Sequence, residues 1–164
     1  MVKPFDPNLK TELLTDSARL AGMGYALIQK ERDSEGQRLI CCGSKAFTPT
    51  QQRYSTMEVE CLGVVWAIKH CKFYLLGMKH FAVLTDHRSL VGVFKQPLRE
   101  VASPRCRILR EKVAGFNFEV QYVKGKTHYT QCEAAHAAGP PHAYRHGRDR
   151  GGQAAGGVGG QGAL

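Results

Sequence analysis

Hydrophobic and polar positions alternate along the first part of this chain in a way that predicts strands before helices. Three stretches, at residues 10–16, 22–30 and 38–47, have the length and apolar content of strands. The links between them are short and polar, and residues 31–37 read as a turn. Consecutive strands joined by short links favour an antiparallel meander.

A helix is predicted after the third strand. Ser55 is a candidate N-cap, and Glu58 three residues later completes a capping box. Apolar side chains then recur at helical spacing and define the face that should meet a sheet, namely Cys61, Val64, Val65, Ile68 and Leu75. We expect this helix to end near Gly77.

The second half of the folded unit alternates strands with helices. Residues 80–85 are apolar enough for a central strand, and residues 116–123 alternate as a last strand. Between them, Ser103 and Pro104 predict the start of a second long helix. Its buried side should carry Cys106, Leu109 and Val113. The order β-β-β-α-β-α-β predicts an α/β domain with a mixed sheet and helices packed on it.

The composition predicts one domain followed by a tail. Of 164 residues, 43% are hydrophobic, which suits a single core. Residues 131–164 are rich in glycine and alanine and have no apolar period, so we expect a domain at 1–130 and a disordered tail. No apolar stretch is long enough to cross a bilayer, and the N-terminus has no signal-like apolar region, so no membrane partner is expected.

The cysteines and the net charge exclude few classes of function. The cysteines form no CxxC pair or zinc spacing, and we expect them to be reduced core residues: Cys41, Cys42, Cys61, Cys71, Cys106 and Cys132. The formal charge is +9, which favours a polyanionic partner such as nucleic acid. A basic protein without such a partner fits the charge equally well.

Two predicted strands end in the same pattern, with Thr followed by an acid at Asp16 and at Asp86. If these strands are parallel neighbours, both carboxylates emerge at the same edge of the sheet, where ligands of such sheets gather. Two acids there repel unless a cation lies between them, and oxygen ligands suit Mg²⁺ or Mn²⁺. The alternative is that both acids only end their strands.

The predicted helix adds a third acid. Glu58 and Glu60 lie about 200° apart around a helix, so they cannot share one site. Glu58 is assigned to the capping box, whereas Glu60 stands beside Cys61 at the margin of the buried face. Glu60 can therefore lean over the sheet toward Asp16 and Asp86. Taken alone, it would read as a solvated helix glutamate.

Four segments in a fixed order carry a family resemblance: LLTDSARLAGMGYALIQ, YSTMEVECLGVVWAIKHCKFYLLG, FAVLTDHRSL and RCRILREKVAGFNFEVQYVKGK. Together they resemble the RNase H domain of gypsy-type LTR-retrotransposon reverse transcriptases, from about Lys3 to Thr130. The resemblance implies the RNase H-like fold, a five-stranded mixed sheet with three antiparallel strands, then two parallel ones, flanked by helices. It also implies that Asp16, Glu60 and Asp86 are catalytic ligands of two Mg²⁺ or Mn²⁺ ions.

The same resemblance implies a substrate, partners and a location. The expected reaction is endonucleolytic hydrolysis of the RNA strand of RNA/DNA hybrids by two-metal catalysis. The expected partners are the hybrid and the polymerase portion of a parent polyprotein, an RNA-directed DNA polymerase. No polymerase motif precedes Lys3, so we do not expect this chain to polymerise DNA by itself. A cytoplasmic or nuclear location is expected from the family and from the lack of an export signal.

Basic and histidine side chains complete the predicted site. Six basic residues are candidates for phosphate contacts: Lys69, Lys72, Lys79, Arg105, Arg107 and Arg110. Each alone is typical of a solvated surface, and the net charge favours interpreting the set as a phosphate footprint. His87 and His128 belong to the family pattern and are expected behind the metal ligands rather than on the metal.

The resemblance breaks after Thr130. The family carries a fourth acid in a motif close to A-D-A-L-S-R, and Cys132 stands at that position. A thiol is a poor ligand for Mg²⁺, and Glu133, one position late, is a weaker candidate that would point about 100° away on a helix. Pro140 and Pro141 also spoil the family's last helix.

Four hypotheses remain open from the sequence. The chain is an active RNase H-type nuclease, a nuclease fold that binds hybrid but cleaves it poorly or not at all because of the missing acid, or a degenerate transposon fragment. The fourth is a basic nucleic-acid-binding module of another origin, which would require Asp16, Glu60 and Asp86 to lie apart.

Overall fold

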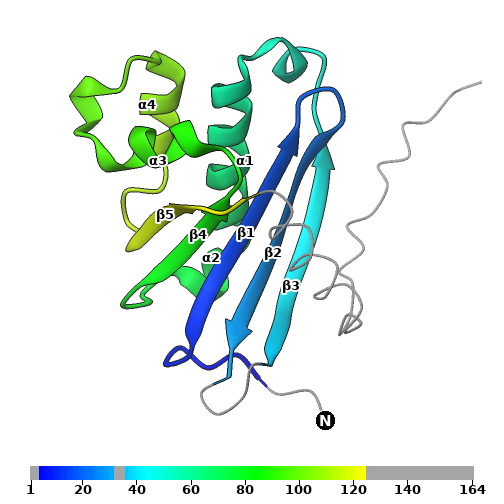
Figure 1. Ribbon diagram of the computed structural model, residues 1–164, viewed down its shortest axis with the longest axis vertical. Helices are drawn as coiled ribbons and strands as arrows, with labels where there is room; N and C mark the ends of the chain where they lie inside the picture. Colours follow the sequence, from blue (N-terminus) through cyan, green and yellow to red (C-terminus); the bar gives the residue numbers. More distant parts are fainter. Residues whose placement is uncertain (1–3, 32–35, 125–164) are drawn as a thin grey trace, which may run out of the picture.

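The computed structural model describes residues 4–31 and 36–124. Within them, five strands form one sheet in the order β3-β2-β1-β4-β5 (Figure 1). The strands are β1 (Lys10–Ala18), β2 (Gly22–Lys30), β3 (Gln37–Ala46), β4 (Phe81–Thr85) and β5 (Phe118–Tyr122). β1, β2 and β3 pair antiparallel, whereas β4 pairs in parallel with both β1 and β5. This arrangement confirms the mixed sheet expected from the sequence.

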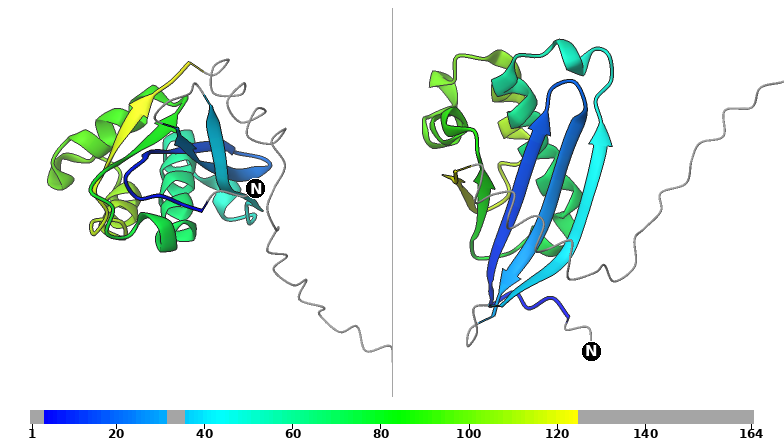
Figure 2. Two further views of the ribbon diagram at one scale, coloured as in Figure 1. Left: turned by 90° about the horizontal axis from the view of Figure 1, so that it is seen from below. Right: turned by 45° about the vertical axis from the view of Figure 1, so that its right-hand side comes forward.

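The helices cover one face of the sheet (Figure 2). They are α1 (Thr56–His70), α2 (Lys72–Leu75), α3 (Arg88–Lys95) and α4 (Pro104–Glu111), with short 3₁₀ turns η1 (Gln51–Arg53) and η2 (Leu98–Glu100). The main core lies between this layer and the sheet, where Leu13, Leu27 and Val83 meet helical residues such as Ile68 and Leu109. A smaller apolar cluster occupies the other sheet face, with Leu14, Ala26, Ile28, Ala82 and Leu84.

Local sequence signals account for α1. The Ser55 hydroxyl accepts from the Glu58 backbone N–H, and the Glu58 carboxylate accepts from the Ser55 N–H, so the capping box is confirmed. The predicted apolar face of the helix is buried, as expected. The helix ends at His70 and α2 continues to Leu75, before Gly77 turns the chain with a φ of +84°.

Two predictions about helices were wrong. No helix was expected between β4 and α4, but α3 lies there, and it buries only Leu90 and Val93. Its apolar residues recur at helical spacing, but its eight residues are fewer than the window of about 11–18 in which a helical period is recognised. The second helix is also shorter than predicted, because after Glu111 the chain continues in turns that bury Val113.

The cysteine prediction is confirmed for three of the five cysteines that the structure describes. Cys61, Cys71 and Cys106 are buried, whereas Cys41 and Cys42 are half-buried on β3, and all five are free thiols. Cys132, Glu133, His128 and the predicted tail lie outside the described residues. Among the helices that the structure describes, none has the length and apolar character to cross a bilayer.

Candidate metal centre

Three acidic side chains meet at one end of the sheet. Asp16 lies near the end of β1, Asp86 directly follows β4, and Glu60 lies in the second turn of α1. One carboxylate oxygen from each residue lies within 4.8 Å of the other two. The structure therefore brings together the three acids that the sequence singled out, and the arrangement in which they lie apart is not observed.

The register of two parallel strands aligns the aspartates. Leu14 of β1 is paired with Leu84 of β4, and each aspartate lies two residues beyond its leucine. Both carboxylates therefore emerge at the same level, outside the C-terminal ends of neighbouring strands.

A close contact between α1 and β1 brings the third acid over the aspartates. A Cβ atom placed on Gly63 would lie 2.3 Å from the Ser17 Oγ, so any other residue there would have to push the Ser17 hydroxyl aside. Gly63 lies almost one helical turn after Glu60 and on the same side of α1. The missing side chain at Gly63 thus lets Glu60 reach the end of β1. The sequence analysis missed Gly63, whose only signal was a glycine inside a helical pattern.

Within the cluster, Glu60 is the most buried acid, and its pKa is strongly raised. Glu60 is 5% exposed, and burial together with the neighbouring charges of Asp86 and Asp16 raises its pKa to about 8. Its Oε2 atom is buried without a hydrogen-bond partner among the residues that the structure describes. A buried carboxylate oxygen without a partner is costly, and a bound cation would satisfy it. The donor set is all oxygen, which suits a hard divalent cation.

His87 lies beside the cluster but makes a structural contact. It is the N-cap residue of α3, and its backbone N–H donates to the Thr85 Oγ1 at 3.1 Å. Its role next to the metal ligands stays a prediction.

Two of the predicted phosphate-binding arginines have partners within the fold. Arg105 forms an ion pair with Glu58 at 3.0 Å and lies 3.9 Å over the Tyr54 ring. Arg110 donates to the backbone carbonyls of Val93 and Gln96. These contacts give both arginines a structural role at the α1, α3 and α4 junctions.

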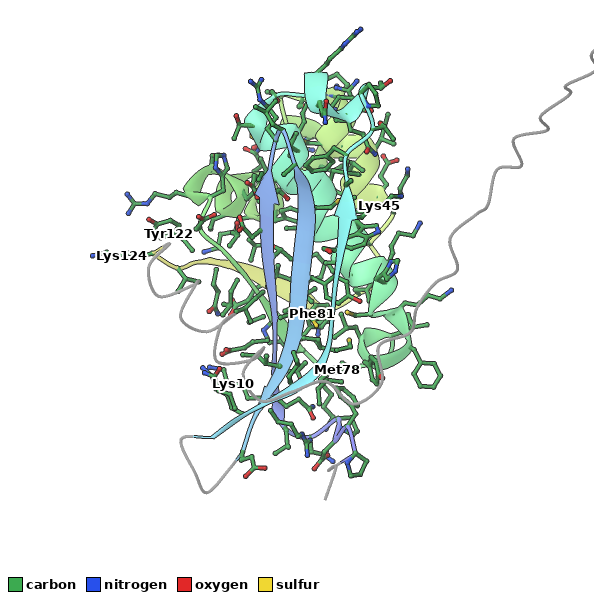
Figure 3. The ribbon with its side chains drawn as sticks, turned by 90° about the vertical axis from the view of Figure 1, so that its right-hand side faces the viewer. Lys10, Lys45, Met78, Phe81, Tyr122 and Lys124 are labelled. Carbon is green, nitrogen blue, oxygen red and sulfur yellow. The ribbon has the colours of Figure 1, made fainter. Side chains whose placement is uncertain are left out.

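The three lysines lie away from the carboxylates. Lys69 is near the C-terminal end of α1, about 13 Å further along the helix axis than Glu60, and Lys72 follows on α2. Lys79 lies in the chain between Met78 and Phe81, the first residue of β4. Phe81 lies at the opposite end of the β4–β5 pair from Tyr122 (Figure 3). Arg107 is half-buried on α4. The predicted nucleic-acid role of these residues stays a prediction.

Sequence reasoning missed an arginine beside the cluster. Arg88 opens α3, two residues after Asp86, and its guanidinium lies 5.6 Å from the centre of the Tyr122 ring. Both side chains are exposed at the end of the sheet where the carboxylates gather. The missed helix explains the omission, because Arg88 could be placed only once α3 was known.

The comparison with protein families identifies the chain. A family model described as "RNase H-like domain found in reverse transcriptase" matches residues 6–111. The chain belongs to this family. The matched residues of this RNase H-like domain include Asp16, Glu60 and Asp86.

Curated relatives are transposon polyproteins. The RNase H-like domain is 36% identical over 118 residues to the Retrovirus-related Pol polyprotein from transposon 412 of Drosophila melanogaster, covering 71% of this chain and 9% of the polyprotein. It is 29% identical over 130 residues to the Transposon Tf2-3 polyprotein of Schizosaccharomyces pombe, covering 79% and 10% respectively. The chain therefore spans about a tenth of the length of these relatives.

Solved structures confirm the fold. The native Prototype Foamy Virus protease-reverse transcriptase matches with a TM-score of 0.56 at 14% identity, over 75% of this chain and 16% of that one. LC11-RNase H1 in complex with RNA/DNA hybrid matches with a TM-score of 0.52 at 11% identity, over 76% and 93%. The foamy viral enzyme in complex with RNA/DNA hybrid gives 0.56 at 18% identity, over 73% and 16%. At these identities the likeness concerns the fold alone, which is RNase H-like.

Proposed function

We propose that this RNase H-like domain hydrolyses the RNA strand of RNA/DNA hybrids endonucleolytically, with Asp16, Glu60 and Asp86 as ligands of Mg²⁺ or Mn²⁺. The observation that carries the proposal is the convergence of the three carboxylates within 4.8 Å around a buried, unpartnered oxygen of Glu60. The family membership and the hybrid complexes of two structural neighbours support the substrate class.

The three acids are placed to bind divalent ions next to a substrate. A pair of divalent ions at such a site supplies an activated water and stabilises both the attacking and the leaving oxygen of a phosphodiester. Asp16 and Asp86 are half-buried, so they can face the substrate, whereas Glu60 approaches from the buried side. The three carboxylates would bind the divalent ions at this end of the sheet. The enzyme would distinguish RNA from DNA by the 2′-hydroxyl groups of the RNA strand.

We propose that the reaction is slow in this chain. Cys132 stands where the family has its fourth acid, and a thiol binds Mg²⁺ poorly. Partners behind a metal ligand are worth about 10–100-fold in activity, and loss of a direct ligand should cost more. Mn²⁺, which tolerates softer ligands, should improve the rate, and Cys132→Asp should raise it further. An unchanged rate in Cys132→Asp would assign the defect to the surrounding segment instead.

An assay with a labelled hybrid tests the proposal. We expect Mn²⁺-dependent cleavage of the RNA strand, none of the matching DNA duplex, and loss of activity with a chelator. Asp86→Asn should abolish cleavage, whereas Glu100→Gln, an exposed acid of η2, should leave it unchanged. Full-rate cleavage by Asp86→Asn would contradict the proposed ligand set, because the cleavage would then not depend on the Asp86 carboxylate.

The second candidate is a domain that binds hybrid without cleaving it. The cysteine at position 132 and the net charge of +9 favour it. If the protein binds hybrid in a salt-dependent way but gives no cleavage product in Mn²⁺, even as Cys132→Asp, the binding function is supported and the nuclease function is not. A degenerate fragment would show neither binding nor cleavage.

We also propose an origin and a setting for the domain. The parent element would be a gypsy-type LTR retrotransposon, and the polymerase portion of its reverse transcriptase would be the partner in the same polyprotein. A cytoplasmic or nuclear location would follow. A fluorescently tagged chain found in a secretory compartment would contradict this location.

A further inference from the structure

Two cysteines from distant parts of the chain meet beneath the edge strand of the sheet. Cys41 lies on β3 and Cys71 caps the C-terminal end of α1, with their Sγ atoms 3.8 Å apart. Cys71 is fully buried, whereas Cys41 is half-buried on the outermost strand. Cys41 is therefore the more accessible residue of the pair, and Cys71 is shielded.

The local backbone around Cys41 can accommodate a closer approach. A disulfide has an S–S distance of about 2.0 Å, so the two sulfurs must close by about 1.8 Å. The register of β2 with β3 shifts so that Leu27 faces Cys41 and Ile28 faces Leu39, which leaves Ile40 as an extra residue. A bulge on an edge strand interrupts the ladder beside Cys41, so a small shift there breaks few backbone hydrogen bonds.

The surroundings shift the pKa values of the two thiols in opposite directions. The hydrogen bond between the two thiols lowers the pKa of Cys41, and burial opposes this shift. A hydrogen bond with the Tyr25 hydroxyl lowers the Cys41 pKa further. The Cys71 pKa is raised, mainly by its hydrogen bond with Cys41 and to a smaller extent by burial. The thiolate that reacts with an oxidant therefore forms on the accessible side, at Cys41.

We propose that Cys41 and Cys71 form a redox-sensitive pair that closes to a disulfide when a peroxide reaches Cys41. The Cys41 sulfur attacks one peroxide oxygen, giving a sulfenic acid and, with a proton, one water. The Cys71 sulfur then attacks the Cys41 sulfur, and the departing hydroxide takes the Cys71 proton as the second water. Two thiols lose two electrons in total, and one hydrogen peroxide is reduced to two waters.

The bond would join the edge strand to the end of the longest helix. Closing this loop restricts the unfolded chain and so raises the midpoint temperature of thermal unfolding. Cys71 lies about 16 Å along α1 from Glu60, and the pair is independent of the proposed nuclease function. Cys61 and Cys106 form a second hydrogen-bonded thiol pair, in which the hydrogen bond lowers the Cys106 pKa to about 7. They test the role of access, because both are fully buried and should stay reduced.

Peptide mapping tests the proposal. The purified chain is treated with stoichiometric hydrogen peroxide, free thiols are blocked, and a non-reducing digest is analysed by mass spectrometry. We expect a peptide that links Cys41 to Cys71, a higher unfolding midpoint, and reversal of both by dithiothreitol. Cys42→Ser, on the next residue of β3 but packed on the other sheet face, should keep the link and the midpoint shift.

Two variants provide the critical comparison. Cys41→Ser should lose the link and the midpoint shift, whereas Cys71→Ser should leave a Cys41 sulfenic acid that dimedone traps. The proposal is overturned if Cys41 in the unmodified sequence pairs with another cysteine, stays a free thiol, or is oxidised to the sulfinic acid without forming a link. It is also overturned if Cys41→Ser retains the full midpoint shift, because a different bond would then be responsible.

Discussion

Glu60 carries the largest electrostatic cost in the site. Its carboxylate is buried, it faces two other acids, and one of its oxygens has no hydrogen-bond donor in the described chain. In most folds such a position holds an apolar residue, because an unpaired buried charge destabilises the native state. The cation proposed above would compensate this charge, and the electrostatics of Glu60 can be tested without any nuclease assay.

The pH dependence of stability reports on Glu60. The folded pKa of about 8 lies above the ordinary glutamate value of about 4.3, so the folded state retains a proton that the unfolded state releases. Without divalent cations, the free energy of unfolding should therefore fall as pH rises between these two values. The loss is about 1.4 kcal/mol for each pH unit of pKa difference.

Urea denaturation in a chelating buffer measures this slope. Glu60→Gln should flatten it and should be more stable than the unmodified protein near the upper end of the range. Glu100→Gln serves as the control, because its exposed side chain lies outside the cluster. Equal slopes in the unmodified protein and in Glu60→Gln would show that another group controls the dependence.

At the scale of secondary structure, the contact between α1 and β1 decides where the acids meet. α1 is fixed at its N-terminal end by the Ser55 capping box, and Glu58 of that box also accepts from the Ser103 hydroxyl at the start of α4. Hydrogen bonds from Ser55 and Ser103 and the Arg105 charge lower the Glu58 pKa, although burial opposes the shift. The helix then meets β1 at Gly63, where a side chain would fit only if the Ser17 hydroxyl moved away.

Substitutions of glycine separate helix propensity from this contact. Gly92→Ala in α3 meets no atom within 4 Å and should stabilise the protein by up to about 1 kcal/mol. Gly63→Ala should give no such gain, because its Cβ would press on the Ser17 Oγ. The double variant Gly63→Ala, Ser17→Ala should recover stability relative to Gly63→Ala alone, as measured by urea denaturation. An equal gain from both single glycine variants would contradict the tight contact.

At the scale of the whole molecule, the fold gathers three separate segments at one end of a parallel strand pair. The N-terminal meander supplies Asp16, the helical layer supplies Glu60, and the second half of the sheet supplies Asp86. A ligand that binds only when all three are assembled stabilises the folded state by mass action. Divalent cations should therefore stabilise the entire domain.

Thermal unfolding with and without Mn²⁺ tests this coupling. The unfolding midpoint should rise with Mn²⁺ concentration, and a concentration of about 100 times the Kd corresponds to about 2.7 kcal/mol. Asp86→Asn should lose most of the increase, while Glu100→Gln should keep it. An equal increase in Asp86→Asn would place the stabilising ion at another site and would remove support for the cluster.

The sequence alone determined the features that depend on neighbouring residues. Strand and helix periods, the Ser55 capping box and the acids after two strands are local patterns, and the family resemblance joined them into one fold and one ligand set. The structure confirms this fold and brings Asp16, Glu60 and Asp86 together. The helix α3 escaped prediction because its eight residues are fewer than the window of about 11–18 in which a helical period is recognised.

Only the tertiary structure decided which side chains are free and which are engaged. Arg105 and Arg110 read as phosphate ligands in the sequence, yet their partners Glu58, Val93 and Gln96 come from other elements. The Gly63 contact with Ser17 and the Cys41–Cys71 pair likewise join residues about 30 or more positions apart. Such contacts depend on how helices and strands pack in space, and no local periodicity carries that information.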